Sequence, residues 1–284
     1  MPRTTTRAPA PASSNSSASV PCIGVFDSGV GGLSILRELR RALPGHRLHY
    51  VADSGHAPYG ERDDAHVIER SMRVVSHLVE HGARAIVIAC NTATAVAARR
   101  LRAAWPQLPF IGVEPGIKPA LALTRSGRIG VMATAATLSS DKFQRLVDTH
   151  GAGQFFHLQA CVGLAAAIER GALDAPELLA LVESHCQPLR QADVDTVVLG
   201  CTHYPFVQAA IQASLGHHVH IVDTAAAVAR HAATLLAEPA ATPEPAHDEP
   251  DVLLETTGDA AQLESFARRR LPFGCEVIAA PCGL

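Results

Sequence analysis

The sequence predicts an α/β fold built on parallel sheets, and three observations support this prediction. From Ile23 onward, short apolar runs alternate with longer stretches of helical periodicity, which is typical of β–α–β units. Several runs are apolar at every position, as strands buried on both faces of a parallel sheet are. Two distant segments, 85–94 (AIVIACNTAT) and 196–205 (TVVLGCTHYP), share a plan of strand, cysteine, polar residues and helix. This shared plan favours two similar domains that face each other.

The elements follow in order along the chain. Apolar runs predict nine strands, at residues 23–26, 48–52, 85–89, 110–113, 129–133, 155–159, 196–200, 220–222 and 252–256. Amphipathic helices are expected between them, among others at 32–43, 63–81, 92–104, 175–191, 204–215 and 224–237. A turn and a last helix follow the ninth strand. Nine strands can form one sheet or two, and the pattern alone leaves both arrangements open.

Two segments do not fit this alternation. Residues 1–20 are rich in Pro, Ser, Thr and Ala and have no apolar stretch of the kind that a secretory signal needs. We expect a disordered tail there, because nothing in it can be buried. Residues 238–250 are rich in proline and acidic residues and are predicted to form a loop.

Composition excludes several classes of protein. The 284 residues suit one large domain or two smaller ones, and 48% hydrophobic residues with only 4% aromatics predict full, aliphatic cores. A net charge of −3 gives no basic excess for binding nucleic acid. No apolar run approaches the ~20 residues that span a bilayer. Seven cysteines, an odd number without any C-x-x-C pair, indicate reduced thiols in a cytoplasmic protein.

Polar residues follow many of the predicted strands, at the edge where open parallel sheets bind their ligands. They are Asp27-Ser28, Asp53-Ser54 with Tyr59-Gly60 close behind, Cys90-Asn91-Thr92, Glu114, and Cys201-Thr202-His203. The turn 27–32 (DSGVGG) lacks the Lys-Ser/Thr of a P-loop. Its backbone N–H groups can form a nest for a small anion such as a carboxylate, or the glycines serve only a tight turn.

Cys90 and Cys201 differ from the other five cysteines, because each follows a buried strand and precedes a predicted helix. A helix N-terminus stabilises a thiolate. A metal site with His203 lacks the usual zinc spacing, and a Cys–His hydrolase leaves one thiol without a role. Two thiols on opposite faces of one carbon acid use both residues, since one removes a proton and the other delivers one.

The motifs around these residues identify a family. IGVFDSGVGGLSILREL, ADSGHAPYGER, AIVIACNTATAVA, IGVEPGIKPA, VVLGCTHYPF and TTGD, in this order from about Ile23 to Leu271, resemble glutamate racemases of the aspartate/glutamate racemase family. Aspartate and hydantoin racemases share the two-cysteine plan but resemble the flanking motifs less. A departure from the family is Val162, which follows Cys161 where proline is frequent.

The resemblance implies two similar α/β domains with parallel-sheet cores and an active site in the cleft between them. Residues 21–114 and 223–284 are expected to form the first domain, and residues 115–222 the second. The implied activity is that of an isomerase: two-base racemisation of L-glutamate to D-glutamate, without cofactor or metal. D-glutamate of this origin supplies peptidoglycan synthesis and so cell-wall biogenesis and cell shape.

The resemblance also implies the roles of individual residues. Cys90 acts on the Cα–H of the D-enantiomer and Cys201 on that of the L-enantiomer, with Asp27 and His203 assisting as further catalytic groups. The substrate-binding positions are Asp27, Ser28, Tyr59, Gly60, Asn91, Thr92, Thr202 and His203, and the supporting acidic positions are Asp53 and Glu169.

The expected partners are L- and D-glutamate, with no nucleic acid and no membrane, and a homodimer is the oligomeric state to be tested. Two rival hypotheses stay open at this point. One is a racemase for another amino acid, such as aspartate. The other is a protein that binds a small dicarboxylate between two domains without turning it over, which leaves the paired cysteines unexplained.

Overall fold

The structure, a computed structural model, describes residues 22–236 and 251–284. The predicted tail 1–20 and the predicted loop 238–250 lie outside the described residues. Within the described ranges the chain is an alternation of strands and helices, and every strand pair is parallel. The predicted α/β class is therefore confirmed.

The described strands form two sheets, which resolves the alternative left open by the sequence. The first sheet has the order β10-β9-β2-β1-β3-β4, with strands β1 (Cys22–Asp27), β2 (Arg47–Ala52), β3 (Ala83–Ile88), β4 (Phe110–Gly112), β9 (Val252–Thr256) and β10 (Glu276–Ala279). The second has the order β6-β5-β7-β8, with strands β5 (Arg128–Ala133), β6 (Phe155–Ala160), β7 (Thr196–Gly200) and β8 (His220–Val222).

Helices flank both sheets. Those that pack around the first sheet are α1 (Leu33–Ala42), α2 (Asp64–Glu80), α3 (Asn91–Val96), α4 (Ala98–Ala104), α11 (Ala225–Leu235) and α12 (Ala260–Arg270). Those around the second are α5 (Ile117–Leu123), α6 (Ala135–Ser139), α7 (Asp141–His150), α8 (Leu164–Glu169), α9 (Pro176–Gln191) and α10 (Gln208–Leu215). Short 3₁₀ turns occur at Ser54–His56 (η1), Tyr59–Glu61 (η2) and Tyr204–Val207 (η3).

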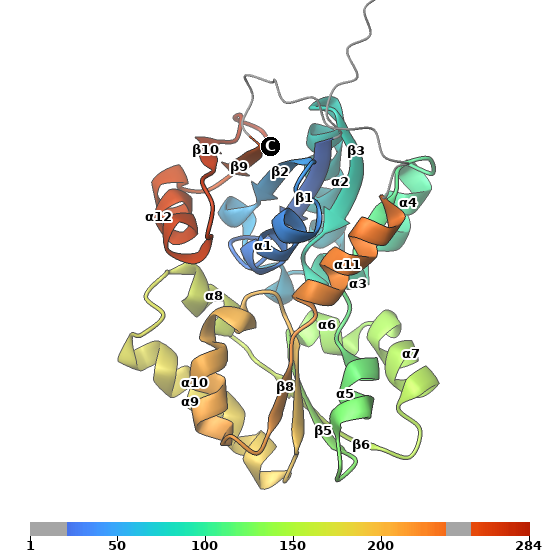
Figure 1. Cartoon of the computed structure of the whole chain (residues 1–284), viewed down its shortest axis with the longest axis vertical. Coiled ribbons are helices and arrows are strands. Elements are labelled where there is room, and N and C mark those ends of the chain that lie inside the picture. Colours follow the sequence, from blue (N-terminus) through green and yellow to red (C-terminus); the bar gives the residue numbers. More distant parts are fainter. Residues whose placement is uncertain (1–21, 237–250) are drawn as a thin grey trace, which may run out of the picture.

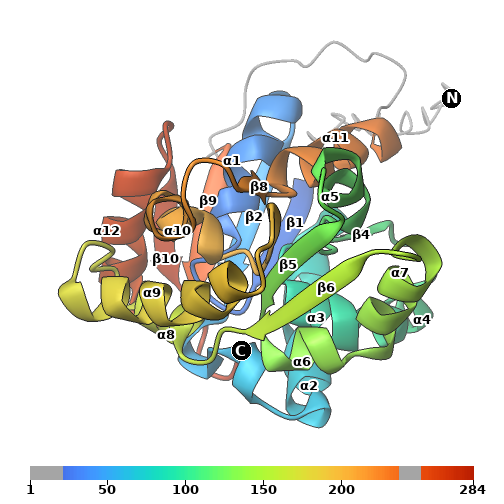
Figure 2. The ribbon, with the colours of Figure 1, turned by 90° about the horizontal axis from the view of Figure 1, so that it is seen from below.

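The two sheets lie one above the other along the long axis of the molecule, the first in the upper half of Figure 1 and the second in the lower half. Helices α6 and α7 of the lower half contact α3 of the upper half, and Figure 2 shows them side by side. One apolar cluster contains buried side chains of both halves, including Leu36 and Val87 from the first and Met132 and Leu199 from the second. Packed side chains thus hold the halves together.

The nine predicted strands are confirmed, and the differences are local. The structure adds β10 (Glu276–Ala279), an edge strand whose residues are largely exposed, so it carries no continuous apolar signal. The predicted helix 92–104 is two helices, because the α-helical pattern is interrupted at Ala97. The predicted helix 204–215 begins as a 3₁₀ turn that contains Pro205, and only then becomes α10.

None of the helices in the described ranges combines the length and the apolar character that crossing a bilayer requires.

Candidate active site

The loops after β1 and β7 meet between the two sheets. Asp27 ends β1 and is fully buried, and the Thr202 hydroxyl, from the turn after β7, donates to its Oδ2 at 2.8 Å. The Ser34 hydroxyl of α1 lies 3.0 Å from the backbone oxygen of Thr202. The carboxyl ends of strands in the two sheets therefore face each other.

Close backbone approach accompanies these hydrogen bonds. A Cβ atom at Gly31 would lie 2.4 Å from Nδ1 of His203, so the imidazole occupies the space that a side chain at this position would need. A Cβ at Gly60 would lie 2.5 Å from Cγ2 of Thr134, a residue of the lower half. Glycine at both positions lets the two halves approach to this distance.

Cys90 lies at the N-terminus of α3, as the sequence predicts. It is the N-cap residue, and its sulfur accepts a hydrogen bond from the backbone N–H of Ala93 at 3.4 Å. The thiol points to Ser28 Oγ at 3.9 Å, and that hydroxyl in turn lies 3.4 Å from Asp27 Oδ1. Burial and then the charge of Asp27 raise the pKa of the Cys90 thiol to about 12, so it is a neutral acid at pH 7.

Cys201 does not lie at a helix N-terminus, and that expectation is wrong. It lies in a turn before η3, where its carbonyl accepts from the N–H of Tyr204 at 3.2 Å. Its sulfur lies 3.6 Å from His203 Nδ1, and His203 Nε2 lies 2.5 Å from Oε1 of Glu169, the last residue of α8. Cys201, His203 and Glu169 thus form a hydrogen-bonded chain, and His203 rather than a helix N-terminus is the group positioned to stabilise a charge on the sulfur.

Two groups in this site have shifted pKa values. Burial lowers the pKa of His203, but hydrogen bonds with Cys201 and Glu169 outweigh it and hold this pKa well above its ordinary value. Burial raises the pKa of Asp27 to about 6, against the opposing effects of the His203 charge and the Thr202 hydroxyl. The site therefore keeps an imidazolium beside one thiol and a titratable carboxyl beside the other.

The glycine-rich turn 27–32 does not offer a free anion nest. The N–H of Gly29 donates to Asp27 Oδ1 at 2.8 Å, and the N–H of Val30 donates to Glu169 Oε1 at 2.7 Å. The Tyr50 hydroxyl fixes the same turn by donating to the Gly29 carbonyl at 2.6 Å. The protein's own carboxylates therefore occupy two of the donors that the sequence suggested for a ligand.

Asp53 and Tyr59 form a second hydrogen-bonded group in the first half. Asp53 is fully buried and accepts both a two-pronged contact from Arg70, at 2.8 and 2.9 Å, and the Tyr59 hydroxyl at 2.5 Å. His56 and the Thr257 hydroxyl also contact it, at 3.0 and 2.8 Å. These bonds fix the loop that follows β2 and hold the Tyr59 hydroxyl on Asp53.

Asn91 and Thr92 begin α3, directly after Cys90. The Thr92 hydroxyl lies 3.0 Å from that of Thr134 in the lower half. Asn91 is 4% exposed, and among the described residues its Nδ2 has no hydrogen-bond partner. A buried amide donor without a partner is costly, so Asn91 is suited to a polar ligand. Glu114, also at a strand end, pairs with Lys142 at 2.9 Å and does not join this group.

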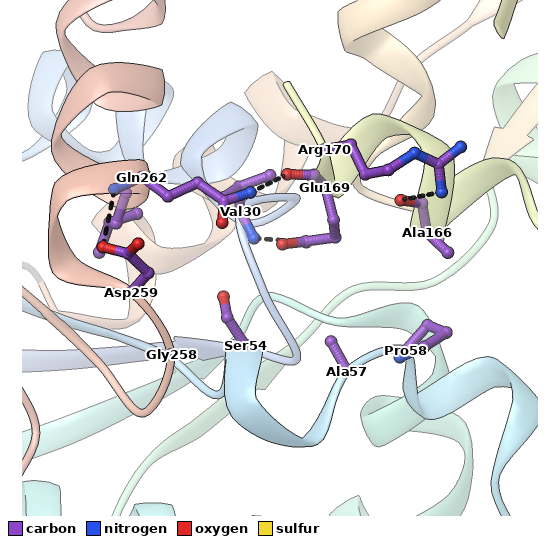
Figure 3. A pocket seen from close by; sticks show the side chains of 11 residues that line it. Val30, Ser54, Ala57, Pro58, Ala166, Glu169, Arg170, Gly258, Asp259 and Gln262 are labelled. Atoms are coloured by element: carbon purple, nitrogen blue, oxygen red, sulfur yellow. Dashed lines mark hydrogen bonds between the residues drawn. The ribbon is translucent and has the colours of Figure 1, made fainter. Parts of the chain in front are cut away.

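A cavity of about 260 Å³ opens beside Glu169. Figure 3 shows it between α8 and the loops of the first half, with the N–H of Val30 donating to the Glu169 carboxylate. Ser54, Pro58 and Asp259 line it from the first half and Glu169 and Arg170 from the second, whereas neither Cys90 nor Cys201 does. The cavity therefore contacts Glu169, the carboxylate that bonds to His203, and does not reach either thiol.

Ser34, Tyr50 and Arg70 contact the site residues but are not among the residues that the sequence predicts for the site. Arg70 was detectable in principle, because it lies on the face of α2 that also carries the buried Val67 and Val74, where a charged residue needs a partner. Ser34 and Tyr50 give no comparable signal, since both act through contacts with residues distant in the sequence or in other loops.

Comparisons with known proteins agree with this geometry. The profile of the Asp/Glu/hydantoin racemase family matches residues 17–232. The chain is 50% identical over 216 residues to the glutamate racemase of Ectopseudomonas mendocina (strain ymp), covering 76% of this chain and 82% of that protein. Its structure resembles glutamate racemase isoform RacE1 of Bacillus anthracis, with a TM-score of 0.81, 32% identity, and 93% and 98% of the two chains covered. It also resembles the Escherichia coli glutamate racemase, solved with L-glutamate and the activator UDP-MurNAc-Ala, with a TM-score of 0.79, 31% identity, and 91% and 99% covered.

Proposed function

The chain belongs to the Asp/Glu/hydantoin racemase family, and we propose that it is a glutamate racemase in which Cys90 and Cys201 work as the two acid/base groups. The observation that carries this proposal is the pair of buried thiols at strand ends of two different sheets, each with its own proton partner. The charge of Cys201 also raises the pKa of the Cys90 thiol, as expected for two sulfurs that share one site.

The surroundings of the thiols suggest which one is ionised before L-glutamate reacts. An imidazolium on His203 donates Nδ1–H to Cys201 and Nε2–H to Glu169, which suits a thiolate on Cys201. Cys90, whose pKa is raised to about 12, is a thiol. The Cys201 thiolate takes the Cα proton from one face, and the Cys90 thiol delivers its proton to the other face. The product is D-glutamate with a Cys201 thiol and a Cys90 thiolate.

The carbanion formed between these two steps needs electrostatic stabilisation, because an amino acid Cα–H is a very weak acid. Asn91 Nδ2 is the described donor best suited to the α-carboxylate, since it is buried and has no partner among the described residues. Ser28, Tyr59, Gly60, Thr92, Thr202 and His203 complete the proposed binding surface. Burial removes competing water and strengthens each of these contacts.

Asp27 and Glu169 serve the two thiols differently in this proposal. Asp27, with a pKa of about 6, accepts the Cys90 proton through the Ser28 hydroxyl when D-glutamate is the substrate. Glu169 holds His203 in place and balances its charge. Asp53 acts at a distance by fixing the loop that carries Tyr59 and Gly60.

The wider setting remains part of the proposal. D-glutamate made in the cytoplasm supplies peptidoglycan synthesis, and the enzyme works as a homodimer, which sedimentation velocity tests directly. The division into one domain of residues 21–114 and 223–284 and a second of 115–222 is supported by the membership of β1–β4, β9 and β10 in one sheet and β5–β8 in the other. Packing of α11 on α1 supports the return of the chain to the first domain.

The deciding experiment incubates the purified protein with L-glutamate in D₂O without added cofactor. Loss of optical activity with one deuterium at Cα in the D-glutamate formed is the expected result. A parallel panel with L-aspartate and other amino acids separates a glutamate racemase from the aspartate rival. Binding of glutamate without exchange or inversion would contradict the proposal and favour the non-enzymatic rival.

A further inference from the structure

Two histidines and a glutamate meet in the first half, away from the proposed thiol site. His49 Nε2 and His77 Nε2 both lie 2.7 Å from the same oxygen, Oε2 of Glu255. All three side chains are buried, with exposed fractions of 5%, 7% and 3%. Across residues 22–236 and 251–284, this is the one group of at least three His, Cys, Asp or Glu residues whose ligand atoms all lie within 4.8 Å of one another.

Three separate elements bring these side chains together. His49 is on β2, Glu255 is on the neighbouring strand β9, and His77 is in the last turn of α2. In the β2–β9 register Glu255 pairs with Val51, two residues after His49, so both side chains lie on the face of the sheet that α2 covers. The arrangement depends on the fold and is not a feature of one local loop.

The exposed His81, which follows α2, lies at the edge of this group. Its ring centroid is 4.2 Å from that of His77 and 5.8 Å from that of His49, and its Nδ1 donates to the His77 carbonyl at 2.7 Å. It places a further, exposed imidazole beside the buried group.

We propose that His49, His77 and Glu255 form a binding site for a divalent transition-metal ion of the zinc class. Imidazole nitrogens with a carboxylate oxygen are a donor set that such ions take. Metal–ligand bonds of about 2.0–2.1 Å in a tetrahedral arrangement separate the ligand atoms by roughly 3.3 Å. The two N···O pairs, now 2.7 Å apart, need to open by only roughly 0.6 Å to reach that separation.

The protons balance in this exchange. A carboxylate oxygen only accepts hydrogen bonds, so each contact with Oε2 carries a proton on Nε2 of the histidine. The metal needs the lone pair of that nitrogen. In a neutral ring the proton moves from Nε2 to Nδ1, and in an imidazolium it leaves to solvent.

The proposal does not depend on the racemase activity, because none of its ligands belongs to the proposed acid/base or substrate-binding set. It is tested by stripping the full-length protein with a chelator and titrating it with Zn²⁺ by calorimetry and with Co²⁺ by absorption spectroscopy. We expect one equivalent bound, a rise in the melting temperature, and a cobalt spectrum without a thiolate-to-metal charge-transfer band. Such a band, or no binding at micromolar concentrations, would overturn the proposal.

Variants locate the site. His77→Gln, and separately His49→Gln, should weaken Zn²⁺ affinity by at least about tenfold. The matched control is the double variant His217→Asn/His218→Asn in the exposed loop before β8, which should bind as the unchanged protein does. Melting without metal shows whether each variant is folded. Equal affinity in the folded His77→Gln and His49→Gln variants, or loss confined to the loop variant, would assign the binding elsewhere.

Discussion

The two cysteine loops start from nearly the same sequence pattern and end in different chemical environments. Cys90 caps α3, receives a helix N–H and points through Ser28 to Asp27. Cys201 lies in a turn and has an imidazole that is itself held by Glu169. These contacts of Cys90 include no cationic group. Cys201, in contrast, contacts the imidazole of His203, whose pKa is held well above its ordinary value.

In the proposed mechanism, this difference determines which of the two thiols is ionised before L-glutamate reacts. Racemisation by two bases needs one thiol and one thiolate at the same time, so two identical environments would leave the resting state undefined. Burial and Asp27 disfavour charge on Cys90, as its raised pKa of about 12 shows. In the proposed mechanism, the imidazolium of His203 compensates the charge of the Cys201 thiolate. We therefore expect substitutions in the Cys90 loop and in the Cys201 loop to impair different proton-transfer steps.

Removing either thiol should have the largest effect. Cys90→Ala and Cys201→Ala are each expected to lower racemisation by at least about 10³-fold, because no other group replaces the lost proton donor or acceptor. Any residual exchange of the Cα hydrogen in D₂O should be confined to L-glutamate in Cys90→Ala and to D-glutamate in Cys201→Ala. Cys275→Ala, at a partly exposed cysteine outside the site, is the control. Racemisation near the unchanged rate in either variant would remove the two-base proposal.

Changing the partners of the thiols should separate the two proton transfers. His203→Asn and Asp27→Asn are each expected to lower kcat by about 10²-fold. Because the equilibrium constant of racemisation is one, kcat/KM must fall equally in both directions. The asymmetry appears in the isotope effect instead: His203→Asn should enlarge it with α-deuterated L-glutamate, and Asp27→Asn with α-deuterated D-glutamate. Equal isotope effects in both variants would refute the assignment of partners.

The buried carboxylate of Asp27 should also cost stability. Its pKa in the folded protein, about 6, lies above the ordinary value of 3.8, so the folded state binds this proton more tightly than the unfolded chain. The ionised form therefore destabilises the fold above about pH 6, and this penalty disappears as pH falls toward 4. Asp27→Asn should stabilise the protein by about 3 kcal/mol at pH 8 and hardly at all at pH 4.

Asp195 supplies the opposite case as a control. Partial burial raises its pKa, but bonds from the Thr124 hydroxyl and the N–H groups of Arg125 and Ser126 outweigh this and lower it well below the ordinary value. Asp195→Asn should therefore destabilise the protein at neutral pH. Thermal melting from pH 4 to 8 measures both variants, and a destabilised Asp27→Asn at pH 8 would contradict the sign derived for Asp27.

The sequence was sufficient for the parts of the fold that rest on local patterns. All nine predicted strands are present, because apolar runs between glycines and polar turns define buried parallel strands. The exposed strand β10 was missed for the same reason. The motifs also predicted which residues meet where the loops after β1 and β7 come together, namely Asp27, Cys201, Thr202 and His203. Their catalytic and binding roles remain predictions.

What the sequence could not provide depends on contacts between distant segments. The sequence leaves a ligand nest and a tight turn open as alternatives for residues 27–32. The structure favours the tight turn, because Asp27 and, from 139 residues away, Glu169 already accept from the N–H groups of Gly29 and Val30. The helix expected directly after Cys201 begins as a 3₁₀ turn that contains Pro205, and Phe206 of this turn packs on Phe266 of the other half. Neither outcome is encoded in a periodicity.

The smallest expected effect concerns the contact that joins the two loops without touching either thiol. The Ser34 hydroxyl lies 2.8 Å from the Gly31 carbonyl and 3.0 Å from the Thr202 carbonyl, so it links the first turn of α1 to the Cys201 loop. Ser34→Ala should lower kcat/KM by about 2–10-fold, the value of one hydrogen bond, and leave the thiol assignments intact. Ser76→Ala, which removes a hydroxyl bonded to Glu80 on the surface of α2, should change nothing measurable. If Ser34→Ala behaves like that control, the link through α1 has no part in aligning the thiols, and the Thr202–Asp27 and Val30–Glu169 hydrogen bonds are sufficient to hold the two loops together.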